Sequence, residues 1–209
     1  MAVEGIFITF EGGEGSGKST QARALARRLR RRGIPLLLTH EPGGEPLAAR
    51  LRRLLKGNSA LAPEAELLLF AASRAQLTAR VIRPALRAGQ WVVCDRYADS
   101  TLAYQGYGRS LDMEAIRAAN RMATGGLTPH LTVLLDVPAP VGLARKHADS
   151  DRFVREPLAF HQRVRQGYLE LARAEPERWL VVDATLPQKE IARIIWQRVA
   201  RLLPGDSQR

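Results

Sequence analysis

The stretch Gly12-Gly-Glu-Gly-Ser-Gly-Lys-Ser-Thr20 follows directly after the apolar run Ile6-Phe7-Ile8-Thr9-Phe10. The pattern G-x-x-x-x-G-K-[ST] binds phosphate where a strand precedes it and a helix follows it. Its glycines let backbone N–H groups turn toward an anion, and the next helix directs its positive end at the same phosphate. A glycine-rich turn that binds nothing is the alternative. The predicted phosphate-binding residues are Gly12, Gly13, Glu14, Gly15, Ser16, Gly17, Lys18, Ser19 and Thr20.

Two side chains of this loop carry the chemistry. Lys18 supplies a mobile positive charge, and Ser19 places a hydroxyl where a phosphate-bound Mg²⁺ needs an oxygen ligand. A carboxylate at the end of a neighbouring strand is the usual second partner of that ion. We expect Asp95 to take this part, because Arg96 follows it and can neutralise phosphate on the same loop. Asp136 and Asp183 also follow apolar runs, and simple strand termination is the alternative for both.

Short apolar runs alternate with helical stretches along the whole chain. Runs of this kind are typical of parallel strands that are covered on both faces. The predicted strands are Ile6 to Phe10, Leu36 to Thr39, Trp91 to Cys94, Leu131 to Leu135 and Trp179 to Val182. The predicted helices are Lys18 to Arg32, Pro46 to Lys56, Pro63 to Ala88, Asp112 to Ala123, Pro157 to Ala174 and Pro187 to Leu203. The pattern predicts an α/β fold with a mostly parallel sheet, whose ligands bind at the carboxyl ends of the strands.

The length of 209 residues suits a single domain. The sequence has no apolar run near the ~20 residues of a membrane span and begins with no signal-like segment, so we expect a cytoplasmic protein. Cys94 is the only cysteine, which excludes an internal disulfide and agrees with a reducing compartment.

The formal net charge of +11 calls for an anionic partner, so nucleic acid has to be weighed against small phosphates. The densest basic cluster, Arg27 to Arg32, closes a predicted helix, where cations stabilise the helix dipole. The cluster contains no aromatic residue on which a base could stack, so a solvated helix end is favoured and nucleic acid is disfavoured as a partner.

Two stretches depart from the simple alternation. Glu41-Pro42-Gly43-Gly44 is a rigid turn after the second strand. The segment from Ala139 to Glu156 is crowded with charge and includes Arg145 and Arg152. An arginine-bearing segment that closes over bound phosphates excludes water and neutralises charge, so we interpret approximately residues 142–156 as a lid, with a solvated helix and loop as the alternative.

These motifs resemble those of the bacterial thymidylate kinase family nearly end to end. The matching stretches are Phe10 to Thr20, Glu41 to Gly44, Leu68-Leu69-Phe70 with Arg74, Asp95 to Gly106, Leu135-Asp136-Val137 with Gly142 to Arg145, and Asp151-Arg152-Phe153. The run Asp95-Arg-Tyr-Ala-Asp-Ser-Thr-Leu-Ala-Tyr-Gln-Gly106 is highly specific, whereas the phosphate loop alone indicates only a nucleotide.

The resemblance implies the P-loop nucleoside monophosphate kinase fold, with a central five-stranded parallel sheet, a short lid and a homodimer. It implies phosphorylation of dTMP to dTDP by ATP with Mg²⁺, a step in dTTP synthesis. Catalysis would fall to Lys18, Asp95, Arg96, Arg145 and Arg152. Arg145 would lie against the adenine, near Asp183 and Thr185, and the metal would be held by Ser19 and Asp95.

The resemblance also implies a set of residues around dTMP. Phe70 would stack on thymine, Arg74 and Gln105 would hydrogen-bond its edge, Glu14 would meet the 3′-hydroxyl, and Tyr104 would exclude a ribose 2′-hydroxyl. The other expected dTMP contacts are Pro42, Arg52, Arg96 and Thr101.

Two positions depart from the family pattern, since His40 replaces an arginine and Glu45 a common threonine. Other readings remain: a kinase of another nucleoside monophosphate, or a nucleotide-switched nucleic-acid-binding protein. Among the proposed dTMP contacts, Phe70, Arg74 and Gln105 favour thymine over other bases.

Overall fold

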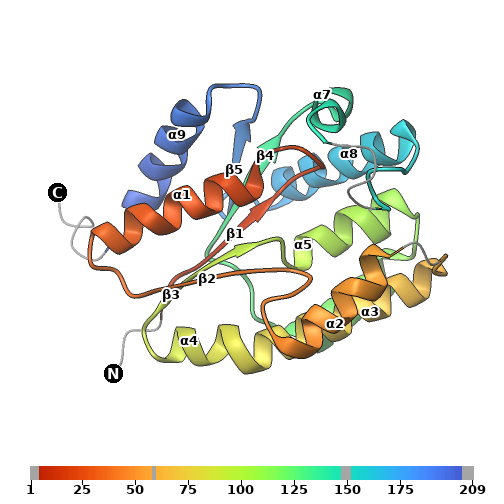
Figure 1. The fold of residues 1–209 in the computed structure, drawn as a ribbon, viewed down its shortest axis with the longest axis horizontal. Coiled ribbons are helices and arrows are strands. Elements are labelled where there is room, and N and C mark those ends of the chain that lie inside the picture. Colours follow the sequence, from red (N-terminus) through yellow and green to blue (C-terminus); the bar gives the residue numbers. More distant parts are fainter. Residues whose placement is uncertain (1–4, 58–59, 147–151, 204–209) are drawn as a thin grey trace.

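Five parallel strands form one sheet in a computed structural model that describes residues 5–57, 60–146 and 152–203 (Figure 1). The strands are β1 (Phe7–Glu11), β2 (Leu36–His40), β3 (Trp91–Asp95), β4 (Leu131–Asp136) and β5 (Trp179–Asp183). Their order across the sheet is β2-β3-β1-β4-β5. The five predicted strands are therefore confirmed, and each ends one residue later than expected because a polar residue closes it.

The register of the sheet brings these polar residues to a single edge. Phe10 of β1 pairs with Asp95 of β3, and His40 of β2 pairs with the same Asp95. Asp136 of β4 pairs with Asp183 of β5. The carboxyl ends of the strands thus lie together, at the edge where parallel α/β sheets bind ligands.

One face of the sheet is covered by α1 (Lys18–Arg31) and α9 (Gln188–Ala200), which lie side by side (Figure 1). Alternate strand residues point into this layer, as the period of two in a strand requires. The shared core includes Ile8, Phe10, Leu25, Leu29, Val93, Val133, Leu135 and Ile195. This packing fixes the start of α1 directly after the phosphate-binding loop.

The opposite face carries a second group of helices. They are α3 (Pro63–Leu77), α4 (Arg83–Arg87), α5 (Ala98–Thr101), α6 (Met113–Thr124) and α8 (Leu158–Ala174). Phe7, Val92 and Cys94 pack under α3 and α4, and Leu134 packs under α8. Two further helices, α2 (Pro46–Lys56) and α7 (Ala139–Ala144), pack on α3 and α8 respectively.

Two π-helical segments were not predicted. The expected continuous helix from Pro63 to Ala88 is wrong in detail, because the π-helix η1 (Thr78–Ile82) separates α3 from α4. Pro84 follows η1, and a proline in a helix has no N–H to donate to the preceding turn. The specific run Asp95 to Gly106 contains α5 and most of the π-helix η2 (Leu102–Gly108). Such π-turns are frequent at functional sites.

The basic end of α1 meets an aromatic ring from another helix. The guanidinium carbons of Arg28 and Arg32 lie 4.0 and 4.9 Å from the ring centroid of Trp196 in α9. The sequence cluster lacks an aromatic residue, and the fold supplies one from 160 or more positions away. Trp196 is thereby engaged within the protein. Across the described ranges, no helix has the length and apolarity that crossing a bilayer requires.

The packing of α8 on η2 depends on the absence of a side chain at Gly167. A Cβ at this position would lie 2.4 Å from Cδ2 of Tyr107. Gly to Ala inside a helix ordinarily stabilises by about 1 kcal/mol, but a forced contact of this kind costs about 1–3 kcal/mol. We therefore expect Gly167→Ala to lower the free energy of unfolding, measured by urea denaturation.

The neighbouring exposed residue provides the control. Gln166 hydrogen-bonds only Glu170 on the same helix, and Gln166→Ala should change the free energy of unfolding by less than about 0.5 kcal/mol. A Gly167→Ala protein as stable as the wild type would show that Tyr107 yields without cost.

Candidate functional site

The loop between β1 and α1 is organised around the buried ammonium of Lys18. Its Nζ donates to the carbonyl oxygens of Gly12 at 3.0 Å and Gly13 at 2.7 Å, and to Oγ of Ser16 at 3.2 Å. These contacts hold the charge inside the curve of the loop. Burial and the nearby charge of Arg96 lower the pKa of Lys18 to about 8, against the opposite influence of Glu14.

The loop also touches α7 through backbone atoms alone. Gly15 has a φ of 67°, in the left-handed region that glycine adopts without strain. A Cβ at Gly15 would lie 1.9 Å from the carbonyl oxygen of Gly142, and a Cβ at Gly142 would lie 2.3 Å from that of Glu14. Only two residues without side chains allow this approach, which places the start of the expected lid against the phosphate loop.

The structure brings together the two residues expected to hold a metal. The hydroxyl of Ser19 donates a short hydrogen bond to Oδ2 of Asp95. Asp136 is occupied by Arg165, whose Nε and Nη2 donate to its two oxygens at 2.7 and 2.8 Å. Of the strand-end aspartates, Asp95 is therefore the one that faces the phosphate loop. A hydroxyl and a carboxylate oxygen are the hard donors that Mg²⁺ requires, so this pair fits the ion.

A cleft of about 830 Å³ opens over these residues. Its lining combines the phosphate loop with the ends of β2 and β3 and the start of the expected lid. The residues that carry charge or hydrogen-bonding groups there include Glu14, Lys18, Ser19, His40, Arg52, Lys56, Asp95, Arg96 and Arg145. The cleft is large enough for a nucleotide and is lined mainly by groups that recognise phosphate.

Arg96 stands at the centre of the cleft in an unusual backbone conformation. Its φ of 72° is in the left-handed region, which a non-glycine residue occupies only where its surroundings impose it. Nη2 of Arg96 donates to Oε1 of Glu14 at 2.7 Å and to the hydroxyl of Tyr104 at 2.9 Å. Tyr104 itself donates to the same Glu14 oxygen at 2.8 Å. The three predicted residues thus form one cluster.

This cluster controls the ionisation of Glu14. Burial opposes the charged carboxylate, but the positive charges of Arg96 and Lys18 and the hydrogen bond from Tyr104 lower the pKa of Glu14 to about 2. Glu14 is therefore an acceptor of hydrogen bonds throughout the neutral pH range.

A narrower pocket of about 60 Å³ adjoins the cleft. Seven residues expected around dTMP line it: Glu14, Pro42, Phe70, Arg96, Thr101, Tyr104 and Gln105. Phe153 closes one side, with its ring centroid 6.0 Å from that of Phe70 and 5.7 Å from that of Tyr104. Most of the expected dTMP residues thus meet at this pocket, whereas Arg52 lines the larger cleft, and a planar base would have to displace an aromatic side chain to occupy the pocket.

Arg74 is buried and fully engaged, which the sequence did not predict. Its Nε and Nη2 contact Oε2 of Glu41 at 2.9 and 2.8 Å. Nη1 donates to Thr101 at 2.8 Å and to Asn120 at 2.7 Å, and Nη2 also donates to the carbonyl oxygen of Tyr97 at 3.1 Å. All five N–H groups of the guanidinium have acceptors within the protein, so a contact with a base edge requires one of them to change partner.

The turn after β2 places Arg52 and explains one of the two departures from the family pattern. Nη1 of Arg52 donates to the carbonyl oxygen of Pro42 at 2.8 Å. Glu45 caps α2, because its carboxylate accepts the N–H groups of Leu47 and Ala48. Glu45 therefore performs the capping that a threonine performs at such a position. Burial and the charge of Arg52 lower the pKa of His40.

Arg145 lies where the phosphate loop meets the segment after β5. Its Nη1 donates to the carbonyl oxygen of Ala184 at 3.1 Å and approaches that of Gly15 at 3.5 Å. Asp183 accepts both the N–H and the hydroxyl of Thr185, which shapes the same segment. An open space of about 370 Å³ lies between these residues and the start of α9.

Arg152 is held by residues that the sequence did not assign to the site. Its Nε donates to the carbonyl oxygen of Leu55, and its Nη2 pairs with Oε2 of Glu66, both at 2.5 Å. Glu66 is fully buried and also contacts Arg109. Residues 147–151 of the expected lid lie outside the described residues, so the lid remains a prediction.

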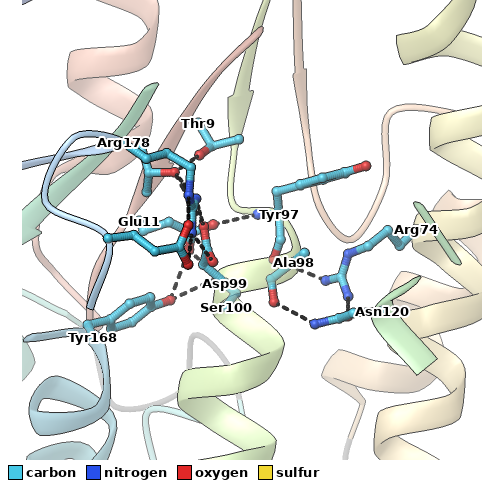
Figure 2. Close-up of polar contacts among 12 residues, drawn as sticks. Thr9, Glu11, Arg74, Tyr97, Ala98, Asp99, Ser100, Asn120, Tyr168 and Arg178 are labelled. Carbon is cyan, nitrogen blue, oxygen red and sulfur yellow. Dashed lines mark hydrogen bonds and ion pairs between the residues drawn. The ribbon is translucent and has the colours of Figure 1, made fainter. Parts of the chain in front are cut away.

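A second buried network of hydrogen bonds joins the end of β1 to the segment after β3 and to α8 (Figure 2). Glu11, at the end of β1, accepts the N–H of Tyr97 at 2.7 Å and the hydroxyls of Ser100 and Tyr168 at 2.5 and 3.0 Å. Burial, followed by the negative charge of Asp99, raises the pKa of Glu11 to about 7. Because Tyr97 follows Arg96 directly, these hydrogen bonds hold the backbone that carries Arg96.

Several residues of the site escaped the sequence reasoning, among them Glu66, Phe153 and Arg109. Glu66 directly precedes the apolar run Leu67-Leu68-Leu69-Phe70, and a glutamate is rarely buried without a partner, so the sequence alone gives little signal that Glu66 lies inside the protein.

Comparison with known proteins gives a consistent result. The family profile described as thymidylate kinase matches residues 10–195. A thymidylate kinase of a Synechococcus species is 55% identical over 199 residues, covering 95% of this chain and 96% of that protein. The thymidylate kinase of Thermomicrobium roseum is 54% identical, with coverages of 94% and 95%. The solved thymidylate kinase of Ehrlichia chaffeensis is 33% identical, with a TM-score of 0.79 and coverages of 94% and 99%.

The raised pKa of Glu11 leads to a pH-dependent prediction. The folded value is about 7 against an ordinary 4.5, so between these values the folded protein binds more protons than the unfolded chain. The favourable contribution of neutral Glu11 is present below about pH 4.5 and is lost as the pH rises through 7. We expect the Tm of Glu11→Gln, relative to that of the wild type, to rise by about 2–6 °C as the pH increases from 5 to 8.

Differential scanning calorimetry at several pH values measures this difference. Glu64→Gln, at an exposed position of α3, is the control and should give a Tm difference that does not vary over the same range. A Tm difference for Glu11→Gln that is constant with pH would mean that Glu11 is ionised throughout.

Proposed function

The chain belongs to the thymidylate kinase family and phosphorylates dTMP, and we propose that it does so with ATP and Mg²⁺ bound at the phosphate loop. One observation carries this assignment: Lys18, Ser19 and Asp95 meet in a cleft of about 830 Å³ beside the pocket that contains Phe70 and Gln105. The cleft would thus hold the phosphates of the donor, and the adjoining pocket would hold the base of the acceptor nucleotide.

The acceptor needs no general base. A phosphate monoester has a second pKa near ~6, so dTMP is mostly a dianion at neutral pH. The protein must instead bring two anions into line and offset their repulsion. Lys18 and Arg96 line the cleft, and the charge of each acts on Glu14. We assign Lys18 to the donor phosphates and Arg96 to the phosphate of dTMP.

Two arginines of the expected lid would supply further positive charge to the phosphates. Arg145 and Arg152 belong to the described parts of the expected lid, on either side of residues 147–151 in the sequence. We assign Arg145 to the adenine of ATP, beside Asp183 and Thr185. Arg152 would neutralise the transferring group after leaving Glu66. Ser19 and Asp95 would hold Mg²⁺, which when bound supplies positive charge to the phosphate oxygens.

The base pocket supports dTMP as the acceptor. We assign Phe70 to stacking on thymine, Tyr104 to the ring beside the deoxyribose and Glu14 to the 3′-hydroxyl, since Glu14 accepts hydrogen bonds at neutral pH. Pro42 and Thr101 line this pocket; Arg52 donates to the carbonyl oxygen of Pro42, and Thr101 accepts a hydrogen bond from Arg74. Direct reading of the base by Arg74 remains a prediction.

Exposed apolar side chains support a homodimer. Leu47 and Leu54 of α2, Leu68 of α3 and Met122 of α6 are 46%, 55%, 63% and 88% exposed. α3 lies beside both α2 and α6, so these residues occur on adjoining helices. A second copy of the chain would cover them. The single-domain organisation and the cytoplasmic location remain predictions from the sequence.

Lys18→Met tests the phosphate loop. The backbone groups that would receive phosphate remain, but the charge on the transferring group loses its partner. We expect kcat to fall by about 10²–10³-fold or more while the protein still folds. A coupled assay of ADP release and a thermal melt measure the two effects.

Lys189→Met, at an exposed position of α9, is the matched control and should retain wild-type turnover. Near-normal activity of Lys18→Met would remove the loop from the catalytic site.

Substitutions of Tyr104 test how the site distinguishes deoxyribose from ribose. Tyr104→Phe retains the ring and should retain the preference for dTMP over the ribonucleotide TMP, with a lower rate because the hydroxyl no longer holds Glu14 and Arg96. Tyr104→Ala should relax the preference by about tenfold, because it removes the clash with a 2′-hydroxyl. The measurement is kcat/KM for both nucleotides. Equal selectivity of the wild type and Tyr104→Ala would assign the preference to another residue.

A further inference from the structure

Glu66 of α3 is a fully buried carboxylate that contacts three side chains, of which Gln105 and Arg152 are predicted residues of the site. Its Oε1 accepts a hydrogen bond from Nε2 of Gln105 at 2.6 Å. Its Oε2 pairs with Nη2 of Arg152 at 2.5 Å and with Nη2 of Arg109 at 3.1 Å. The pocket-lining Gln105 and the lid arginine therefore share one carboxylate.

The contact with Gln105 determines which way its amide faces. A side-chain amide has a donating end and an accepting end, and an ionised carboxylate can only accept. The NH₂ group of Gln105 must therefore face Glu66, and its carbonyl oxygen is left for the pocket. Gln105 is 1% exposed and lines that pocket.

An outward carbonyl oxygen selects the hydrogen-bonding pattern of the base. Thymine and uracil carry an N–H group at ring position 3, which donates, whereas cytosine has a bare nitrogen there, which accepts. A carbonyl oxygen facing a bare nitrogen leaves two acceptors in contact and unpaired. The reverse amide orientation would offer a donor and would favour cytosine at this position.

We propose that Glu66 is a positioning residue that fixes the Gln105 amide with its oxygen toward the monophosphate pocket and so selects bases with an N–H at position 3. The proposal rests on the proposed function, because it takes the pocket to bind a pyrimidine nucleotide. Glu66 does not line the pocket, and its effect on the choice of base passes through Gln105, whereas its pairing with Arg152 affects dTMP and dCMP alike.

Neighbouring arginines stabilise the ionised Glu66 and so the orientation of the Gln105 amide. An isolated buried carboxylate would be costly, and two guanidinium groups compensate its charge. Arg109 also donates to Glu156 at 2.6 Å, and the guanidinium carbons of Arg109 and Arg152 lie 5.9 and 4.6 Å from the ring centroid of Phe153. Nε of Arg109 also donates to Oε1 of Glu66 at 3.3 Å, so the arginines hold Glu66 as an acceptor on both of its oxygens.

The test is the ratio of kcat/KM for dTMP to that for dCMP. Glu66→Gln has the same shape but can donate as well as accept, so the Gln105 amide can turn over. We expect the ratio to fall by about 10–100-fold, mainly through a higher KM for dTMP. The double variant Glu66→Gln with Gln105→Glu restores an acceptor toward the pocket and a donor behind it, and should recover most of the ratio.

Arg109→Gln is the matched control, because it weakens the same cluster but leaves the carboxylate facing Gln105. It should lower Tm and retain the wild-type ratio. An unchanged ratio in Glu66→Gln, or a double variant without recovery, would overturn the inference. A wild-type protein that does not phosphorylate dTMP would instead overturn the proposed function, which is a separate outcome.

A measurement on the wild type covers the case in which Glu66→Gln does not fold. In NMR spectra of the free protein, the NH₂ protons of Gln105, assigned by their loss in Gln105→Glu, should exchange slowly with solvent. On addition of dTMP they should shift little, while the N–H proton of the bound base becomes protected. Large shifts of the NH₂ protons with a freely exchanging base proton would show the reverse orientation and refute the inference.

Discussion

The buried carboxylate of Glu11 is the interaction on which the site depends. It lies at the end of the central strand and accepts hydrogen bonds from Tyr97, Ser100 and Tyr168, which belong to the segment after β3 and to α8 (Figure 2). An acceptor buried at this place obliges the chain after β3 to turn sharply, since the N–H of Tyr97 must point back at β1. The left-handed conformation of Arg96 follows from that turn. Strain at a functional residue persists only where the surrounding structure imposes it, and here the hydrogen bond from Tyr97 to Glu11, together with that from the N–H of Arg96 to the carbonyl oxygen of Phe10, supplies the constraint.

Buried pairs of carboxylate and arginine recur around this centre. Glu14 pairs with Arg96, Glu41 with Arg74, Glu66 with Arg152, and Asp99 with Arg178. Such pairs contribute little net stability, because desolvation offsets the attraction, but losing one partner is costly. Their value lies in geometry, since a guanidinium donates in fixed directions and places its neighbours accordingly. The strongly basic composition therefore reflects arginines in the buried ion pairs of the site as well as charge on the surface.

The sequence predicted the parts of the fold that depend on local pattern. The five strands, the phosphate loop and the strand-end position of Asp95 all follow from apolar periodicity and a motif whose spacing is set by phosphate chemistry. The π-helical segments were missed because the periodicity of a π-turn differs little from that of an α-helix over so few residues. The burial of Arg74 and the partners of Glu66 were missed for another reason. They join residues 33 to 86 positions apart, and the sign and spacing of charges along a chain do not show which of them meet.

The backbone contact between the phosphate loop and α7 constrains how this chain can change. Gly15 and Gly142 approach so closely that a Cβ on either would overlap the backbone of the opposite segment. Neither position can accept a side chain alone, and a substitution at one cannot be relieved by repacking at the other, because no side chain is present there to shrink. The two sites therefore lack any single-step path to another residue that preserves the contact. In a set of descendants of this chain, both glycines should therefore stay fixed.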